Sequence, residues 1–277
     1  MKGVTRRQAS LRFMRLWLMA LGACWYSLAL NAAERVDIVA FEYPPIYQDS
    51  QGPDKGLAID LAIAAFRAVD VDVSLRFFPV ARMIRYVEDG LATCAIGGRV
   101  LFEDPAVAPK VKVGSVIHYV TQTFIYDRRR FPDGIRYAQL ERLSGLRIGA
   151  LHSSGILKYL QKTDGLNLIP NNTHEGSARQ LQAERIDLWA IVDLTGYLYL
   201  KMLFGGEAEE FERTASFNRG DVSLVCSRQQ DANGVYARKF AEGLSRIKKN
   251  GTYLQIMAKY YGDIKRINPE SLPDDMK

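Results

Sequence analysis

The sequence predicts an α/β protein built from two sheets, each mainly parallel and flanked by helices. Strand-like and helix-like segments alternate through residues 35–96, and the same alternation begins again at residues 147–192. A long strand-like run at residues 113–126 connects the two series. Such alternation is typical of parallel sheets with helices on their faces. With 277 residues, 48% of them hydrophobic and 25% charged, the chain can form two modest cores and is neither collagen-like nor disordered.

The first 33 residues have the layout of a secretory signal peptide. They carry five basic residues and no acidic residue, and an uncharged stretch at 16–33 ends in small residues. The strongly apolar part is shorter than the roughly 20 residues that span a bilayer, so cleavage near residues 32–33 is favoured over a retained anchor. A Leu-Gly-Ala-Cys segment ending at Cys24 resembles a lipoprotein processing box, but the apolar stretch continues beyond it, so lipidation is the less favoured alternative. We therefore expect a periplasmic protein.

The charge of the exported chain gives no indication of nucleic-acid binding. The whole chain has a net charge of +6, and removal of the five basic residues of the leader leaves 32 basic and 31 acidic residues, a net charge of +1. Two cysteines then remain, Cys94 and Cys226. They could pair in an oxidising compartment, or they could be two small buried residues in apolar strands, which is the alternative that we favour.

The first series of elements contains three strands and two helices. Residues 35–41 alternate and then run apolar, which predicts a strand that ends in a loop with an acid, an aromatic residue and two prolines. Apolar residues at helical spacing predict a helix from Gly56, and Gly90 ends the following one. In chain order the predicted elements are 35–41, 56–69, 71–78, 79–89 and 91–96.

The second series repeats this order without repeating its sequence. Its last strand is an apolar run bounded by Asp187 and Asp193, which is typical of a strand buried on both faces. A returning strand at 217–226 and two C-terminal helices follow, with Gly251 and Gly262 at helix-stop positions. The polar tail after Asp263 is expected to pack loosely. The predicted elements of the second series and C-terminus are 147–151, 156–162, 166–169, 175–185, 188–192, 217–226, 235–249 and 252–261.

The sequence lacks the motifs that commonly mark catalysis or cofactor binding. It has no Gly-x-Ser-x-Gly, no phosphate-binding glycine loop, no His-Glu-x-x-His and no Cys-x-x-Cys. The three histidines, His118, His152 and His174, are scattered. We therefore expect no catalytic residue, no metal and no cofactor.

Polar residues gather just past the C-terminal ends of the predicted parallel strands, where open α/β sheets place their ligand groups. Some of them have a structural alternative: Asp193 could cap the helix that follows it, Ser153 or Ser154 could cap the helix that opens there, and Arg82 could lie on a solvated helix face. The candidate ligand-binding residues are Glu42, Tyr43, Arg82, Gly98, Arg99, His152, Ser153, Ser154 and Asp193.

Three segments resemble the family 3 extracellular solute-binding proteins, the periplasmic receptors for polar amino acids and related solutes. Gly-Leu-Ala-Ile-Asp-Leu at 56–61 is similar to that family's Gly-Phe-Asp-Val-Asp-Leu. Residues 184–193 are similar to its Gly-x-x-Asp-Ala … Asp segment. The most specific segment, Lys-Lys-Asn-Gly-Thr-Tyr through Lys-Tyr-Tyr-Gly at 248–262, resembles its terminal Lys-x-x-Gly-Thr-Tyr … Lys-Tyr-Phe-Gly signature. The resemblance covers about residues 35–263.

This resemblance implies a two-lobed, hinged, type II periplasmic-binding fold. The first lobe would comprise residues 34–118 and 221–277 and the second lobe residues 121–218, with hinges near 118–121 and 218–221. Asp193 matches the family acid that holds a ligand ammonium group. The family's Thr-x-x-Arg, whose arginine pairs with the ligand carboxylate, has no match here, and Arg99 or Arg82 could substitute for it.

The function that the resemblance implies is capture of a small polar solute, an amino acid or a related amine or carboxylate, in the cleft between the lobes. The partner would be an ABC permease in the inner membrane, and we expect a monomer. Two alternatives use the same scaffold: an orphan ligand sensor, and a dehydratase-like enzyme with Glu42 or Asp193 as general acid or base.

Overall fold

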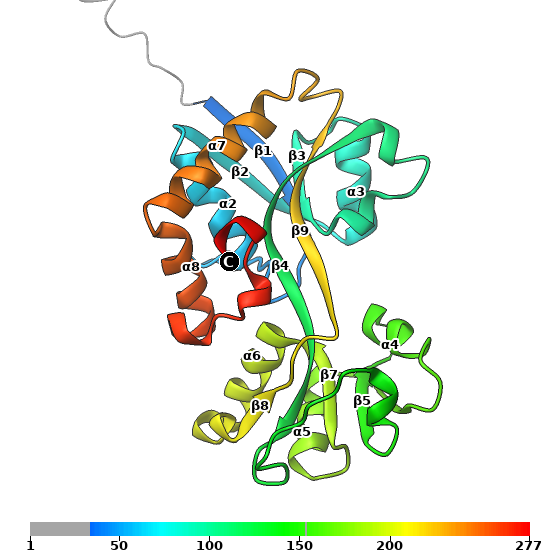
Figure 1. Cartoon of the computed structure of the whole chain (residues 1–277). Helices are drawn as coiled ribbons and strands as arrows, with labels where there is room; N and C mark the ends of the chain where they lie inside the picture. The colour runs from blue at the N-terminus through cyan, green and yellow to red at the C-terminus, as the bar shows by residue number, and fades with distance from the viewer. Residues whose placement is uncertain (1–33, 153) are drawn as a thin grey trace, which may run out of the picture. The chain divides into compact units, whose positions relative to one another are not determined.

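Two long antiparallel strands, β4 (Val111–Asp127) and β9 (Asn218–Ser227), run side by side through the middle of the sheet (Figure 1). The computed structural model describes residues 34–152 and 154–277, so the predicted signal peptide, its cleavage region and Cys24 lie outside the described residues. Arg35–Lys277 forms one compact unit. We call residues 34–118 and 221–277 the first lobe and residues 121–218 the second lobe.

The strands form a single nine-stranded sheet in the order β2-β1-β3-β9-β4-β7-β5-β6, with β8 paired to β4. Pairs β1/β3, β5/β6 and β5/β7 are parallel, as predicted from the alternation of strands and helices. The other strands are β1 (Glu34–Ala40), β2 (Val71–Phe77), β3 (Cys94–Gly97), β5 (Arg147–Leu151), β6 (Asn167–Asn171), β7 (Leu188–Val192) and β8 (Phe211–Arg213).

The predicted crossing of the long strand between the sheets of the two lobes is confirmed, and it joins them into one continuous sheet. Strand β4 pairs with β9 from Val111 to Gln122, and it pairs with β7 from Gln122 to Ile125. Because one strand hydrogen-bonds to both sets of neighbours, the ladder continues from the first lobe into the second.

Helices cover both faces of the sheet in each lobe (Figure 1). The first lobe contains α2 (Leu57–Arg67), α3 (Val80–Glu88), α7 (Val235–Lys249) and α8 (Thr252–Tyr261). The second contains α4 (Gly155–Leu160), α5 (His174–Gln182) and α6 (Asp193–Phe204). The predicted α/β fold class is thus confirmed.

Strand β7 shows why a continuous apolar run predicts a strand buried on both faces. Successive side chains of a strand point to opposite sides of a sheet. Leu188 and Ala190 belong to the core that covers one face, and Trp189 and Ile191 belong to the core on the other. All of them are buried, so no polar residue is tolerated on either face.

The close contact of α2 and α7 depends on one glycine. A Cβ atom placed on Gly243 would lie 1.9 Å from the carbonyl oxygen of Ala65, so only glycine fits at this crossing. Phe66 and Phe240 pack beside it with ring centroids 5.1 Å apart.

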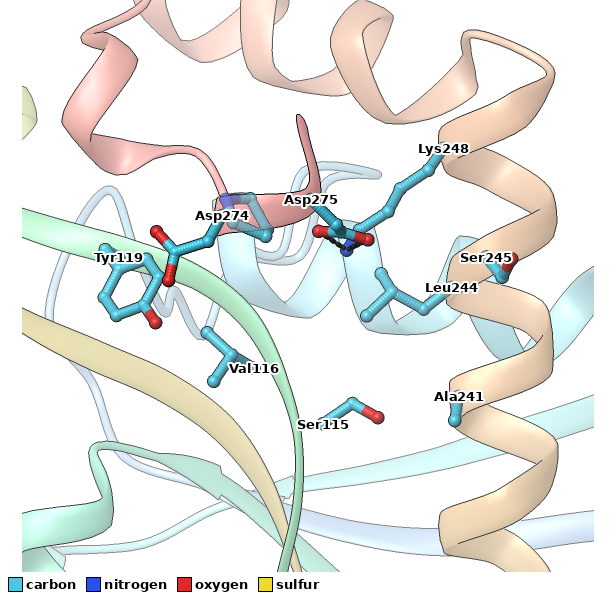
Figure 2. A pocket seen from close by; sticks show the side chains of 10 residues that line it. Ser115, Val116, Tyr119, Ala241, Leu244, Ser245, Lys248, Asp274 and Asp275 are labelled. Atoms are coloured by element: carbon cyan, nitrogen blue, oxygen red, sulfur yellow. Dashed lines mark hydrogen bonds and ion pairs between the residues drawn. The ribbon is translucent and has the colours of Figure 1, made fainter. Parts of the chain in front are cut away.

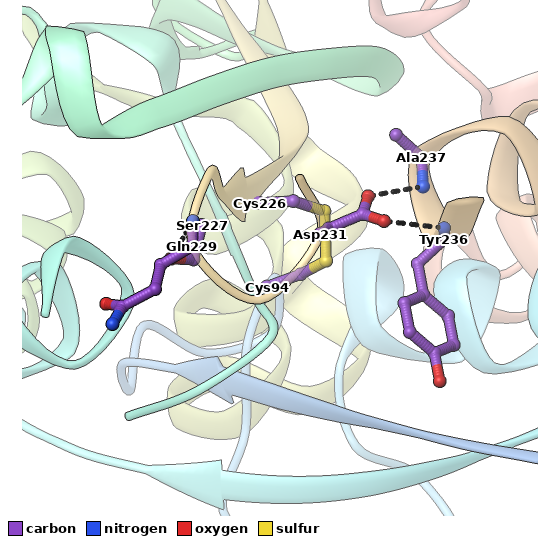
Figure 3. Close-up of a disulfide and its surroundings, with 7 residues drawn as sticks. All are labelled: Cys94, Cys226, Ser227, Gln229, Asp231, Tyr236 and Ala237. Atoms are coloured by element: carbon purple, nitrogen blue, oxygen red, sulfur yellow. Dashed lines mark hydrogen bonds between the residues drawn. A yellow bond between two sulfur atoms is a disulfide. The ribbon is translucent and has the colours of Figure 1, made fainter. Parts of the chain in front are cut away.

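Cys94 and Cys226 form a disulfide, so the favoured prediction of two unpaired cysteines is wrong (Figure 3). The two residues face each other directly in the antiparallel β3/β9 pair, although 132 positions separate them in the chain. Both are buried.

Close to the disulfide, the Asp231 carboxylate accepts hydrogen bonds from the backbone N–H groups of Tyr236 and Ala237 at the start of α7 (Figure 3).

The tail after Asp263 is well packed, which contradicts the expectation of a loose segment. Ile267, Asn268 and Ser271 are buried, and three short 3₁₀ turns shape the chain. Asn268 caps one of these turns by accepting a hydrogen bond from the backbone N–H of Glu270. The turns are Ile264–Arg266, Pro269–Ser271 and Asp274–Met276.

Candidate functional site

The loop after β1 brings the first lobe against the first turn of α6. The hydroxyl of Tyr43 hydrogen-bonds to the side chain of Thr195, and the Thr195 hydroxyl donates to the carbonyl oxygen of Pro44 at 3.3 Å. Burial raises the pKa of Tyr43 above its ordinary value, so its hydroxyl stays protonated. Glu42, the residue before it, is exposed to solvent.

A second group of candidates meets at the end of β3. The Nε atom of Arg99 lies 3.8 Å from a carboxylate oxygen of Asp221 on β9. The Ser223 hydroxyl donates to that same oxygen at 2.6 Å. A Cβ atom on Gly98 would lie 3.3 Å from the backbone oxygen of Asp221, so the chain turns closely past β9 at this point. Gly98, Arg99 and Asp221 therefore form one local cluster.

Asp221 is a further candidate that the sequence did not indicate. Its side chain is 20% exposed, and that of Arg99 is 53% exposed. The Asp221 charge adds to burial in raising the pKa of Tyr47, which places this carboxylate within electrostatic range of the β1 loop as well. No local pattern marks Asp221, because Gly98 and Arg99 come from a segment more than 100 residues earlier in the chain.

Arg82, His152 and Ser154 lie at other strand and helix ends. Arg82 is exposed in the first turn of α3, with its guanidinium 5.9 Å from the centroid of the Phe78 ring. His152 is exposed, and its backbone N–H donates to the carbonyl oxygen of Asn171 at 2.7 Å. Ser154 is the N-cap of α4, because its hydroxyl accepts from the backbone N–H of Leu157 at 3.0 Å. Ser153 lies outside the described residues.

Asp193 is buried, with 1% of its surface exposed. It is the first residue of α6, after Val192 at the N-cap position, and its carboxylate accepts a backbone N–H at the start of the helix, as the capping alternative describes. Its Oδ1 accepts from the backbone N–H of Leu194 at 2.6 Å, and its Oδ2 accepts from the side-chain amide of Asn268 at 3.1 Å.

Two further side chains complete the surroundings of Asp193. The Thr121 hydroxyl hydrogen-bonds to the carboxylate, and a guanidinium nitrogen of Arg213 lies 3.7 Å away. Burial raises the pKa of Asp193, while Arg213, Thr121, Asn268 and the Leu194 N–H oppose that rise by stabilising the charged form. The Asp193 carboxylate is therefore already hydrogen-bonded and ion-paired to groups of the protein itself.

Two hollows in the described part of the chain do not include any predicted site residue. A cavity of about 370 Å³ lies between β4, α7 and the C-terminal residues (Figure 2). Another of about 510 Å³ lies beside Glu88, Lys110 and Arg228. The Arg99–Asp221 cluster thus lies apart from both.

The described residues, 34–152 and 154–277, contain no candidate metal site and no candidate membrane span. Within this part of the chain, His, Cys, Asp and Glu side chains nowhere form a group of three or more that could hold a metal ion. In the same residues no helix is long and apolar enough to cross a membrane.

Solved structures with the same arrangement of elements are numerous. The unliganded, open L-cystine solute receptor of Neisseria gonorrhoeae is 15% identical, with a TM-score of 0.66 over 86% of this chain and 97% of the receptor. The chain has the periplasmic-binding-protein fold. A polar amino acid ABC transporter substrate-binding protein from Streptococcus thermophilus shares this fold, with 17% identity and a TM-score of 0.65 over 85% of this chain and 90% of its own.

The periplasmic-binding-protein fold also includes proteins with other partners. A histidine kinase sensor domain with similarity to periplasmic binding proteins is 21% identical to this chain, with a TM-score of 0.56 over 83% of this chain and 97% of the domain. No family model and no curated protein matches the sequence. At these identities the likeness shows the fold, and the fold implied by the sequence resemblance is confirmed.

Proposed function

We propose that this protein is a periplasmic receptor that captures a small polar solute between its two lobes and delivers it to an ABC permease. The solute class is an amino acid or a related amine or carboxylate. Support comes from the periplasmic-binding-protein fold and from similar structures whose names describe binding of L-cystine, arginine or polar amino acids.

The Arg99–Asp221 cluster is the observation that carries the proposed ligand class. A cation and an anion lie 3.8 Å apart, which is longer than a direct hydrogen bond, and both remain partly exposed. A zwitterionic solute can engage both groups: its carboxylate pairs with the planar guanidinium, and its ammonium group with the carboxylate. We therefore assign the ligand-ammonium role to Asp221 in place of Asp193, whose carboxylate is already occupied.

The other candidates would complete this proposed site. Tyr43 and Gly98 would line it from the first lobe, with Glu42 and Arg82 at its edge. His152, Ser153 and Ser154 would contact the solute from the second lobe when the hinge closes. Closure would rotate the lobes about the paired segments 118–122 and 218–222, shifting an existing equilibrium between open and closed forms.

A thermal-shift screen of amino acids, amines, small carboxylates and sugars identifies the ligand, because binding to the folded state raises its apparent stability. Calorimetry with the best ligand then tests the site. Arg99→Gln and Asp221→Asn should each weaken binding about 10- to 100-fold, as expected for the loss of a charge-assisted hydrogen bond. Arg85→Gln, which changes an exposed arginine on the same helix as Arg82, is the control.

One result would show that this assignment is wrong. If Arg99→Gln and Asp221→Asn bind like the wild type while Asp193→Asn loses binding with an unchanged melting temperature, the ligand ammonium group is held by Asp193. Mass spectrometry of the incubated ligand tests the dehydratase-like alternative, which requires a product.

A sensor role is the second candidate, because the similar structures include the histidine kinase sensor domain. Affinity capture from membranes with liganded and unliganded protein distinguishes the two. Ligand-dependent recovery of a permease supports transport, and recovery of a kinase supports sensing.

A further inference from the structure

The C-terminal residues 263–277, which we call the strap, contact both lobes. The strap leaves the end of α8 at Gly262 and lies beside β4 and above α6 (Figure 1). Its central residues are buried, so it is a packed part of the fold.

Arg266 attaches the strap to the second lobe at two points. Its guanidinium pairs with Glu209, which lies just before β8. Its carbonyl oxygen accepts from the guanidinium of Arg213, the residue that lies beside Asp193.

Asn268 is the central contact of the strap. Its side-chain NH₂ group donates to Asp193 on α6 at 3.1 Å and to the Thr121 hydroxyl on β4 at 3.1 Å. The Ser216 hydroxyl lies 3.5 Å from the same nitrogen. Because the residue is 94% buried, water cannot readily replace these contacts if the amide is removed.

The end of the strap is attached to the first lobe and to β9. The Lys248 ammonium group on α7 donates to both carboxylate oxygens of Asp275, at 2.8 and 3.0 Å (Figure 2). Arg219 on β9 donates to Asp274 at 3.3 Å. The same guanidinium lies 3.5 Å from the centroid of the Tyr119 ring on β4.

We propose that the strap couples the two lobes and favours one relative orientation of them, with Asn268 as its main contact to the second lobe. A rotation about β4 and β9 moves Asp193 and Glu209 relative to Lys248, so the strap cannot keep all of its contacts in both arrangements. Each contact that breaks on rotation therefore adds to the free-energy difference between them. This role of Asp193 explains why a carboxylate at the end of β7 is buried and fully occupied.

Distances between the lobes test the proposal directly. Spin labels on Leu91→Cys and Met202→Cys, both exposed and in different lobes, report the inter-lobe distance in the exported protein by double electron–electron resonance. The native Cys94 and Cys226 are joined and do not take up label. Without ligand, Asn268→Ala should shift or broaden the distance distribution, and amide exchange at residues 118–122 should become about tenfold faster.

Arg266→Ala removes an exposed contact and serves as a second variant if Asn268→Ala fails to fold. It should shift the distribution in the same direction. Asn172→Ala, an exposed asparagine in the second lobe, is the matched control and should leave the distribution unchanged.

A distribution identical to the wild type in both strap variants would overturn the proposal, even if their melting temperatures fall, because Asn268 would then stabilise the fold only locally. These measurements need no ligand, so their outcome does not depend on the assignment of Arg99 and Asp221.

Discussion

Asp187 and Asp193, at the two ends of β7, both form hydrogen bonds or ion pairs with other groups of the protein. Asp187 accepts hydrogen bonds from Arg147 and Arg130, and these contacts hold its pKa well below the ordinary value. Asp193, at the other end of the strand, contacts Thr121, Arg213 and Asn268. An aspartate at the end of a strand is thus expected to make polar contacts. Whether it contacts the protein itself or a ligand depends on the residues that surround it in space.

Asp193→Ala should lower the free energy of unfolding by about 2–4 kcal/mol, because it removes one acceptor of the buried Asn268 amide and the negative charge beside the guanidinium of Arg213. Chemical denaturation measures this loss. Asp49→Ala, which changes an exposed aspartate, should stay within about 0.5 kcal/mol of the wild type. A loss for Asp193→Ala as small as that control would contradict the structural role.

His118 makes folding stability depend on pH. The residue is fully buried in β4, and burial lowers its pKa from 6.5 to about 4. The carbonyl oxygen of Tyr119 lies 3.0 Å from Nδ1 and opposes this fall in pKa. Within the described residues Nε2 has no hydrogen-bond partner, so a second proton there would have no acceptor.

Because the folded pKa of His118 lies below the unfolded value, the unfolded chain binds the proton more readily. The stabilising contribution is complete above about pH 6.5 and is lost as the pH falls towards 4, with a total of about 3 kcal/mol. Denaturation curves at a series of pH values should show this loss in the wild type. His118→Gln should flatten the curve in that window.

At the scale of elements, the crossing of α2 and α7 allows no side chain at residue 243. Gly243→Ala should destabilise the protein by about 1–3 kcal/mol, because the helices must move apart to admit a methyl group. Gly155→Ala is the control, since a Cβ atom there meets open space. Equal melting temperatures for the two variants would show that the helices can separate without cost.

The β3/β9 pair contains the disulfide. Replacing both Cys94 and Cys226 with alanine should lower the free energy of unfolding by about 2–5 kcal/mol, because the cross-link restricts the unfolded chain over a long loop. Denaturation of the double variant beside the oxidised wild type measures this. A midpoint that does not change would indicate that sheet packing alone holds the two strands.

For the whole molecule, the proposed receptor function predicts that the best ligand compacts the protein. Small-angle scattering should show a smaller radius of gyration with ligand, because closure brings the lobes together. The Arg99→Gln variant at the same ligand concentration should keep the unliganded radius. A ligand that binds tightly without any compaction would contradict hinge closure.

Much of the fold could be predicted from the sequence because its signals are local. The apolar run at 188–192, the helical spacing after Gly56 and the glycines after the last helices each act within a few residues. The Cys94–Cys226 bond, the Arg99–Asp221 cluster and the Asn268–Asp193 contact join residues 75 to 132 positions apart, so no local pattern encodes them. The polar composition of residues 263–277 predicted that this tail would be exposed. In the structure, several of its polar side chains pair with residues of the two lobes.

The placement of β9 between β3 and β4 has a consequence for biogenesis. The first lobe is discontinuous, since β9 completes its sheet only after the whole second lobe has been made. During synthesis from the N-terminus, residues 121–218 are therefore available as an uninterrupted folding unit, while residues 34–118 lack a strand that emerges more than 100 residues later. We expect the second lobe to fold first, and the first lobe to remain incomplete until β9 has been made.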